Sequence, residues 1–266
     1  MFSKYILSVC FLIILSTQLP AQNTNKETGL TPLKSHSQFF YSKGYETRAE
    51  TMKEFLSEAN AFYQSEYPEI FSGINVLILD KNDWVEKYLI IPYGIPFFDN
   101  EKSIVIPADK LTAAMELGYE DLSTDKEISE YDKYVLNTLG QSYILKSRNI
   151  KVPEVWMQDF LSTYFAISFF EVNDFVWELN PGEGEDIIQR SLSAYNLSHQ
   201  DLPAANYYWY QARFIELATK LFNKGGFQLL TELLNHFQAK GLLQGAEEII
   251  NKYAESEYKE WKFKMK

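Results

Sequence analysis

The feature that most constrains this chain is a change of pattern near residue 125. Beyond it strand signals almost vanish, and apolar residues recur at the spacing of helices. Gly225-Gly226 and Gly241 separate the last three helical segments, because glycine favours helix termination. The periodic segments lie at about 127–147, 153–171, 184–194, 204–223, 225–239 and 244–262. A back half made of packed helices is therefore expected.

The front half is predicted to form short strands around one long helix. A helical stripe runs from residue 45 to 67 and stops at Pro68. Runs rich in β-branched and aromatic residues, which favour strands, lie at 37–42, 74–79 and 103–106. The order predicts an α+β fold in which a small mixed sheet lobe with a long helix precedes a mainly helical lobe.

The N-terminus has the pattern of a secretory signal peptide. An apolar stretch at 5–15 follows one basic residue and is short for a membrane-spanning helix, although a retained signal anchor stays an alternative. We expect cleavage near Ala21 or Gln22, which makes the mature protein secreted or periplasmic in a bacterial envelope, without a membrane span. The expected divisions are a signal peptide, a polar leader, a sheet lobe and a helical lobe in one compact two-lobed unit, at 1–21, 22–36, 37–124 and 125–266.

Composition excludes several classes of function. The chain has 36 acidic and 25 basic residues, and its formal charge of −11 repels nucleic acid. The single cysteine, Cys10, lies in the signal segment, so the mature chain lacks a disulfide and a cysteine nucleophile. The three histidines, His36, His199 and His236, are far apart in sequence. None of them has the spacing of a zinc motif.

Several segments resemble the gluzincin-like HExxH metallopeptidases, a family of secreted zinc enzymes. The front segments of the resemblance run from Tyr41 to Tyr45, Asp80 to Trp84, Pro92 to Phe97 and Ile104 to Ala108. The later segments run from Val135 to Gln141, Val155 to Phe165 and Tyr207 to Gln211. The resemblance covers roughly residues 37 to 240. It implies a zincin-like fold with a metal helix followed by a second, ligand-bearing helix.

The catalytic positions of that family are substituted in this chain, where NTLGQ replaces HELGH. By position, Asn137 and Gln141 replace the two zinc-binding histidines, Thr138 replaces the general-base glutamate, and Asp159 stands at the third ligand. Neutral amides are weak zinc ligands, and a threonine hydroxyl does not accept a proton near neutral pH. We therefore expect no zinc, no other cofactor and no hydrolysis by this route.

Two other interpretations of these residues stay open. Asn137, Gln141 and Asp159 would form interlocked hydrogen bonds in the space where zinc bridged two helices, because buried polar groups need partners. Alternatively, NTLGQ is an ordinary solvated helical turn. Elsewhere, Asp80 followed by Asp83 is best explained as a capped helix start with an acidic first turn.

The resemblance also suggests what function remains without catalysis. In that family the substrate lies as an extended strand along a sheet edge, which here falls near Pro96 to Ile106. We therefore expect a pseudopeptidase that binds a peptide or protein segment. The candidate binding residues are Ile104, Val105, Ile106, Tyr207, Tyr208 and Tyr210, although the helical spacing of the tyrosines favours core packing.

Two alternatives belong to other classes of function. One is an active hydrolase that uses Asp159 with a nearby acid, Glu154 or Glu130. The other is a structural envelope protein without a ligand. The sequence leaves the oligomeric state open.

Overall fold

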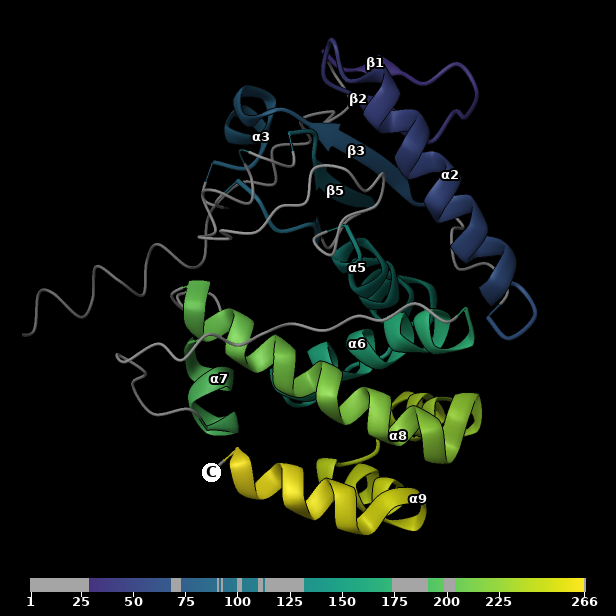
Figure 1. Cartoon of the computed structure of the whole chain (residues 1–266), viewed down its shortest axis with the longest axis vertical. Helices are drawn as coiled ribbons and strands as arrows, with labels where there is room; N and C mark the ends of the chain where they lie inside the picture. Colours follow the sequence, from purple (N-terminus) through teal and green to yellow (C-terminus); the bar gives the residue numbers. More distant parts are fainter. Residues whose placement is uncertain are drawn as a thin grey trace, which may run out of the picture.

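The computed structural model describes most of the chain beyond its first 28 residues. The described residues are 29–67, 73–89, 91, 93–99, 102–109, 112, 132–173, 191–198 and 204–265, with only the backbone at 204–208. The predicted signal peptide at 1–21 and Glu130 therefore lie outside the described residues. Figure 1 shows the sheet lobe at one end of the molecule and the C-terminal helix α9 at the other.

A five-stranded mixed sheet forms the front lobe. Its strands lie in the order β1-β2-β3-β5-β4. The pairs β2–β3 and β3–β5 are parallel, whereas β1 and β4 run antiparallel at the two edges. The strand bounds are Thr31–Pro32 for β1, Phe39–Tyr41 for β2, Asn75–Leu79 for β3, Phe97–Phe98 for β4 and Ser103–Pro107 for β5. The central strands β3 and β5 are continuous apolar runs, as expected for strands buried on both faces.

Each face of the sheet is covered by different elements. Ile78 and Ile104 belong to the main core with helix α2 (Glu46–Tyr63), whose apolar stripe includes Met52 and Leu56. Leu77, Leu79 and Val105 face a smaller cluster centred on Trp84 of α3 (Lys81–Lys87). The Asp80 side chain accepts a hydrogen bond from the Asp83 amide at 2.8 Å. This contact confirms the predicted cap of α3.

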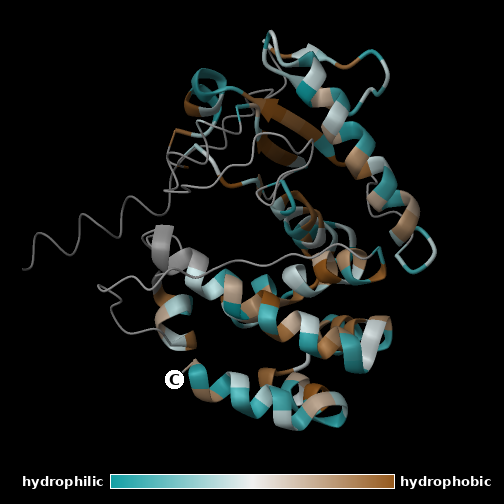
Figure 2. Ribbon diagram, viewed as in Figure 1, coloured by the Kyte–Doolittle hydropathy of each residue, from teal (hydrophilic) through white to brown (hydrophobic). Residues whose placement is uncertain are grey.

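The back half is a stack of helices. The helices are α5 (Tyr134–Ser142), α6 (Val155–Val172), α7 (Leu192–Ser198), α8 (Ala204–Gln238) and α9 (Leu243–Lys264), and a π-helical turn, η1 (Tyr143–Ser147), continues α5. The helix α6 is apolar around most of its circumference, because α5 packs against one side of it and α8 against another. Hydrophobic residues are concentrated on the central strands and on the inner helix surfaces (Figure 2).

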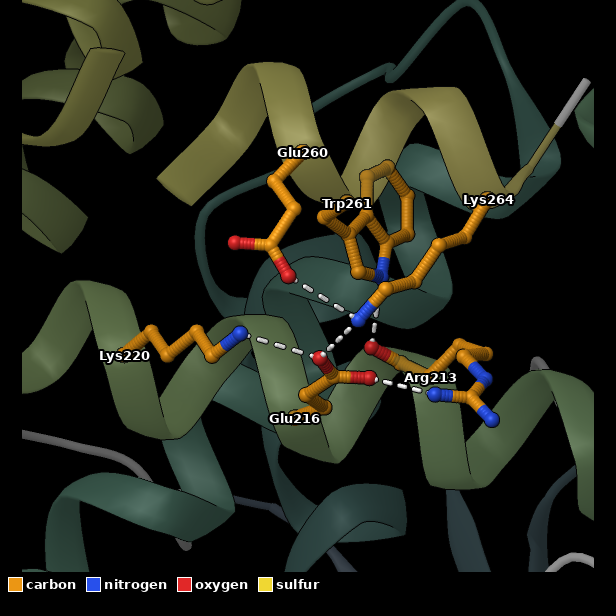
Figure 3. Close-up of polar contacts among 6 residues, drawn as sticks. All are labelled: Arg213, Glu216, Lys220, Glu260, Trp261 and Lys264. Atoms are coloured by element: carbon orange, nitrogen blue, oxygen red, sulfur yellow. Dashed lines mark hydrogen bonds and ion pairs between the residues drawn. The ribbon is translucent and has the colours of Figure 1, made fainter. Parts of the chain in front are cut away.

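A polar cluster fastens α8 to α9. The Glu216 carboxylate accepts hydrogen bonds from Arg213, Lys220 and Lys264, at 2.6, 3.0 and 3.0 Å (Figure 3). The Trp261 indole of α9 donates to the Arg213 carbonyl oxygen at 2.7 Å. Burial disfavours the charged form of Glu216, but the hydrogen bonds from Lys264, Lys220 and Arg213 outweigh it and lower its pKa to about 2.

The α+β class is confirmed, with a helical majority. Three parts of the chain differ from the predicted elements. β1 lies inside the predicted polar leader, since Leu33 beside it is buried. Residues 127–131 of the helix predicted at 127–147 lie outside the described residues. Within the described part, α5 begins at Tyr134 and continues into the π-helical turn η1. Of the segment predicted at 184–194, residues 184–190 lie outside the described residues, and α7 (192–198) extends past the predicted end.

The predicted separation of two helices at Gly225-Gly226 is confirmed. Two helical segments of α8 meet at a kink at Gly226, whose φ of 51° lies in the left-handed region that favours glycine. Among the described residues, no helix is both long and apolar enough to cross a membrane.

Candidate functional site

The substituted motif lies where α5 and α6 come closest together. A Cβ atom at Gly140 would lie only 3.0 Å from the Phe165 side chain of α6. Glycine at this position therefore allows the two helix backbones to approach. The Leu-Gly pair of the motif thus has a packing role, and it brings the neighbouring polar side chains of α5 close to α6.

Asn137 connects the two helices by a hydrogen bond. Its amide nitrogen Nδ2 donates to the Thr163 hydroxyl at 2.8 Å. The same hydroxyl donates to the backbone carbonyl oxygen of Asp159 at 2.8 Å, one turn earlier in α6. Asn137 thus forms an interhelical contact between α5 and α6.

Thr138, the next residue of α5, is directed toward the sheet. Its side chain is buried, and its hydroxyl lies 3.1 Å from both the Pro96 and the Tyr134 carbonyl oxygens. Pro96 directly precedes the edge strand β4. Thr138 therefore holds α5 against the start of β4, and its hydroxyl is engaged as a donor.

The expected interlock of Asn137, Gln141 and Asp159 is only partly present. Asn137 reaches the backbone of Asp159 through Thr163, but it does not bond the carboxylate. Within the described part of the chain, Gln141 forms no hydrogen bond and is half-buried. The physical reason is that Asp159 turns toward α7, away from α5, and finds a donor there.

The Asp159 carboxylate lies at the junction of three helices. The Tyr195 hydroxyl of α7 donates to its oxygen Oδ2 at 2.5 Å. The Gln211 amide nitrogen of α8 lies 3.5 Å from the same hydroxyl. Desolvation raises the pKa of Asp159 to about 6, although the hydrogen bond from Tyr195 opposes the shift. Asp159 is thus a carboxyl group that titrates near neutral pH.

Sequence reasoning missed Tyr195 and Gln211. Neither was given a role, although Gln211 ends one segment of the resemblance, and each lies far from Asp159 along the chain. One signal existed for Gln211, since Phe214, Ile215 and Ala218 follow it at helical spacing and are buried. A polar residue on such an apolar face indicates a buried polar contact.

The acids proposed to assist Asp159 have different surroundings. Glu154 accepts a hydrogen bond from the Asn196 side chain, and Asn196 accepts one from the Trp156 amide at 3.1 Å. Glu154 thus helps to fix the start of α6 against α7. Glu130 lies outside the described residues.

The predicted peptide-binding edge, near Pro96 to Ile106, contains both β4 and β5, and its candidate residues Ile104 to Ile106 lie on β5. Ile104 and Val105 pair with β3 on one side and with β4 on the other, and Ile106 pairs with β3. The side chains of all three residues are fully buried. These residues therefore lie inside the sheet, and β4 is the edge strand. The sequence could not show this, because a two-residue strand carries almost no periodic signal.

The tyrosine candidates also differ from the expectation where they are described. Tyr210 is buried, packs on Tyr195 with ring centroids 4.7 Å apart and donates its hydroxyl to the Ser191 carbonyl oxygen at 3.0 Å. It is a core residue that supports the Asp159 junction. The side chains of Tyr207 and Tyr208 lie outside the described residues.

The described residues contain no group of three His, Cys, Asp or Glu side chains placed to hold a metal ion. No protein-family model matches the chain, and no curated protein or solved structure matches it either. The geometry of α5, α6 and β4 is therefore the basis for any functional inference.

Proposed function

We propose that this chain is a secreted, non-hydrolytic peptide-binding protein with a zincin-like arrangement of sheet and helices. Its ligand would lie as an extended strand along β4, above α5. The observation that carries the proposal is the contact between Thr138 and Pro96, because it uses the general-base position to hold the edge strand. A side chain engaged in this way supports a binding surface and supplies no base for hydrolysis.

The geometry of β4 supports an added strand. Phe97 and Phe98 pair with β5 on one side only, and no described strand pairs with their other side. The Asp99 amide donates to the Ser103 carbonyl oxygen at 3.0 Å, so alternation directs the polar backbone groups of Phe98 away from β5. These groups are available for a ladder with an extended peptide.

The interaction can be tested with peptides that differ only in backbone methylation. An array of decapeptides that samples all residue types would first identify a binder. Two versions of this binder would then carry N-methyl groups on the odd or on the even residues. We expect one version to lose at least tenfold in affinity and the other to bind nearly as before, because an added strand uses alternate amides.

A second test uses Thr138→Val, which keeps the shape of the side chain but removes the hydroxyl that contacts the Pro96 carbonyl oxygen. We expect weaker peptide binding and no gain of hydrolysis. Equal binding of both methylated peptides would overturn the proposed β4 edge. Stoichiometric zinc in the purified protein, with peptidase activity lost on chelation, would overturn the non-hydrolytic assignment.

A second candidate, a hydrolase that uses carboxylates without zinc, is favoured by one observation. The pKa of Asp159 is raised to about 6, which suits a general acid or base near neutral pH. A panel of peptidase and glycosidase substrates tests it, with turnover abolished in Asp159→Asn as the supporting result. Absence of turnover across the panel would favour the binding function.

A further inference from the structure

A pocket that is open to solvent lies between the β1–β2 hairpin and α2, and we call it the hairpin pocket. Its volume is about 130 Å³. The residues that line it are His36, Gln38, Phe39, Leu56, Ser57 and Asn60. The strand order places this hairpin at the edge of the sheet opposite to β4. The hairpin pocket is therefore separate from the proposed peptide site.

The hairpin wall of the pocket is held in place by contacts within the protein. The Leu33 amide donates to the Phe39 carbonyl oxygen at 2.8 Å, and the Phe39 amide donates to the His36 carbonyl oxygen at 3.2 Å. The His36 ring meets the Phe39 ring edge-on, with the centroids 4.9 Å apart. The Ser35 hydroxyl donates to the Glu50 carboxylate of α2 at 2.9 Å. The pocket is thus formed before a ligand binds, which lowers the entropic cost of binding.

The polar side chains of the pocket supply both donors and acceptors. The His36 nitrogen Nδ1 lies 3.4 Å from the Gln38 backbone amide. Because Nδ1 accepts there, the N–H of a neutral imidazole is on Nε2. On the α2 side, Ser57 is exposed and Asn60 is half-buried. Within the described part of the chain, neither side chain forms a hydrogen bond. A ligand in the pocket can therefore bond an imidazole, a hydroxyl and a carboxamide.

The lining also determines the class of ligand. None of the described residues around the pocket carries a carboxylate, an ammonium or a guanidinium group. A full charge placed there would lose water without gaining an opposite charge. A hydroxyl group, in contrast, is both a donor and an acceptor, so it matches the imidazole, hydroxyl and carboxamide groups. The chemistry of the lining therefore favours a neutral ligand with several hydroxyls.

The shape of the pocket sets the size of this ligand. Phe39 and Leu56 are buried and provide an apolar surface for one face of a ring. A closed cavity of about 150 Å³ holds one benzene ring. The hairpin pocket is slightly smaller but open, so it accommodates one six-membered ring that partly protrudes into solvent.

We propose that the hairpin pocket binds one ring of a neutral sugar. The C–H face of the ring packs on Phe39 and Leu56, and its hydroxyls bond His36, Ser57 and Asn60. The sugar is a free monosaccharide or the terminal unit of a glycan, because both present the same neighbouring hydroxyls. This site adds a second ligand to the protein and does not depend on the peptide site at β4.

The imidazole NMR signal of His36 measures binding in the full mature chain. The chain has three histidines, and comparison with His36→Phe assigns the signal. The probes are glucose, galactose, mannose and N-acetylglucosamine, each as the free sugar and as its methyl glycosides. Glucuronate and glucosamine are the charged counterparts of glucose, and galacturonate and galactosamine are those of galactose.

We expect at least one neutral sugar to shift the His36 signal in a saturable way, with a dissociation constant in the millimolar range because the contact is small. Glucose or galactose, whichever binds, should bind at least tenfold more tightly than its charged counterparts. Binding of a methyl glycoside as tight as that of the free sugar assigns the terminal unit of a glycan. Loss of binding in both methyl glycosides assigns a free monosaccharide.

Variants of α2 test whether the sugar lies in the pocket. Asn60→Leu removes the carboxamide with little change of volume and should lower the affinity at least tenfold. Ser57→Ala should lower it severalfold, and alanine is well tolerated in a helix. Ser65→Ala is the matched control, because Ser65 is exposed just beyond α2 and does not line the pocket. Its affinity should be that of the wild type, and thermal unfolding checks that all variants fold.

Three results would overturn the proposal. The first is a His36 signal that no sugar shifts. The second is an affinity that is unchanged in both Asn60→Leu and Ser57→Ala, because the sugar then binds elsewhere. The third is equal or tighter binding of the charged sugars, which contradicts a neutral ligand. None of these results affects the peptide site at β4, which the methylated peptides test separately.

Discussion

Two carboxylates in the helical lobe, Asp159 and Glu216, have opposite surroundings. Glu216 of α8 accepts hydrogen bonds from three basic side chains, and its pKa falls to about 2. Asp159 of α6 receives one hydrogen bond from an uncharged tyrosine, and its pKa rises to about 6. Both helices belong to one packed stack. The difference shows that burial alone does not set the pKa of a carboxylate. Its hydrogen-bond partners also decide the direction of the shift.

The two carboxylates also differ in the partners that surround their charge. The Glu216 cluster fastens α8 to α9, because Lys264 of α9 reaches across to it. At the Asp159 junction the Gln211 amide oxygen is buried without a hydrogen-bond partner. Buried polar groups without partners are typical of functional sites, because a bound ligand can supply the missing partner.

The largest expected effect is that of Asp159→Asn on stability without a ligand. The pKa of Asp159 rises from 3.8 to about 6 on folding. Its stability contribution is fully present below about pH 4 and is lost as the pH rises through 6. At pH 7.5 the neutral amide should therefore stabilise the protein, by up to about 3 kcal/mol at about 1.4 kcal/mol per pKa unit.

Urea unfolding at pH 7.5 and pH 4.0 measures this effect. The gain should disappear at pH 4.0, where the wild-type carboxyl is already protonated. An equal or lower stability of Asp159→Asn at pH 7.5 would show that the charge is compensated in solution.

A smaller effect of opposite sign is expected for Glu216→Gln. The pKa of Glu216 is lowered on folding, so its stability contribution is present above about pH 4.5 and is lost as the pH falls toward 2. The carboxylate side chain is 23% exposed, and solvent screening reduces the gain. We expect a loss of about 1 kcal/mol at pH 7.

Acid titration of unfolding free energy from pH 6 to pH 2 tests this prediction. Glu248→Gln is the matched control, because Glu248 is exposed and accepts a hydrogen bond only from Gln244 of its own helix, at 3.2 Å. The two variants should differ at pH 6 and converge toward pH 2. A Glu216→Gln curve parallel to that of the wild type would contradict the role of the cluster.

The smallest expected effect is that of Tyr195→Phe. Its hydroxyl lowers the pKa of Asp159, so its removal should raise that pKa further. The lost hydrogen bond costs about 1 kcal/mol of stability at pH 7. Carboxyl carbon NMR titration of Asp159 reports the pKa directly.

Tyr210→Phe serves as control, since that hydroxyl donates to the Ser191 carbonyl oxygen. It should cost similar stability without moving the Asp159 titration. An Asp159 pKa that stays the same in Tyr195→Phe would remove Tyr195 from the junction.

Elements with a strong local pattern were predictable from the sequence. The strand predicted at 74–79 is β3, and the helix predicted at 153–171 is α6, with ends shifted by one or two residues. The two-residue strands β1 and β4 were missed, because such strands form only through pairing with a neighbour. The predicted edge near Pro96 to Ile106 contains β4, but the candidate residues Ile104 to Ile106 lie on β5.

The candidate site was predictable in part. Asn137, Thr138 and Asp159 were singled out through a family resemblance, and the structure places all three at or beside the contact of α5 with α6. Their partners were not predictable. Tyr195, which bonds Asp159, lies 36 residues from it along the chain, and Gln211, which contacts Tyr195, lies further away. No spacing rule links positions so distant.

The sequence by itself determined the α+β class and the helical back half. These are properties of local pattern and residue type. Only the tertiary structure decided that β4 is the edge, that Thr138 is directed toward Pro96 and that Asp159 turns toward α7. Hydrogen-bond partners and desolvation depend on packing between distant segments, and these two factors set the chemistry of a carboxylate.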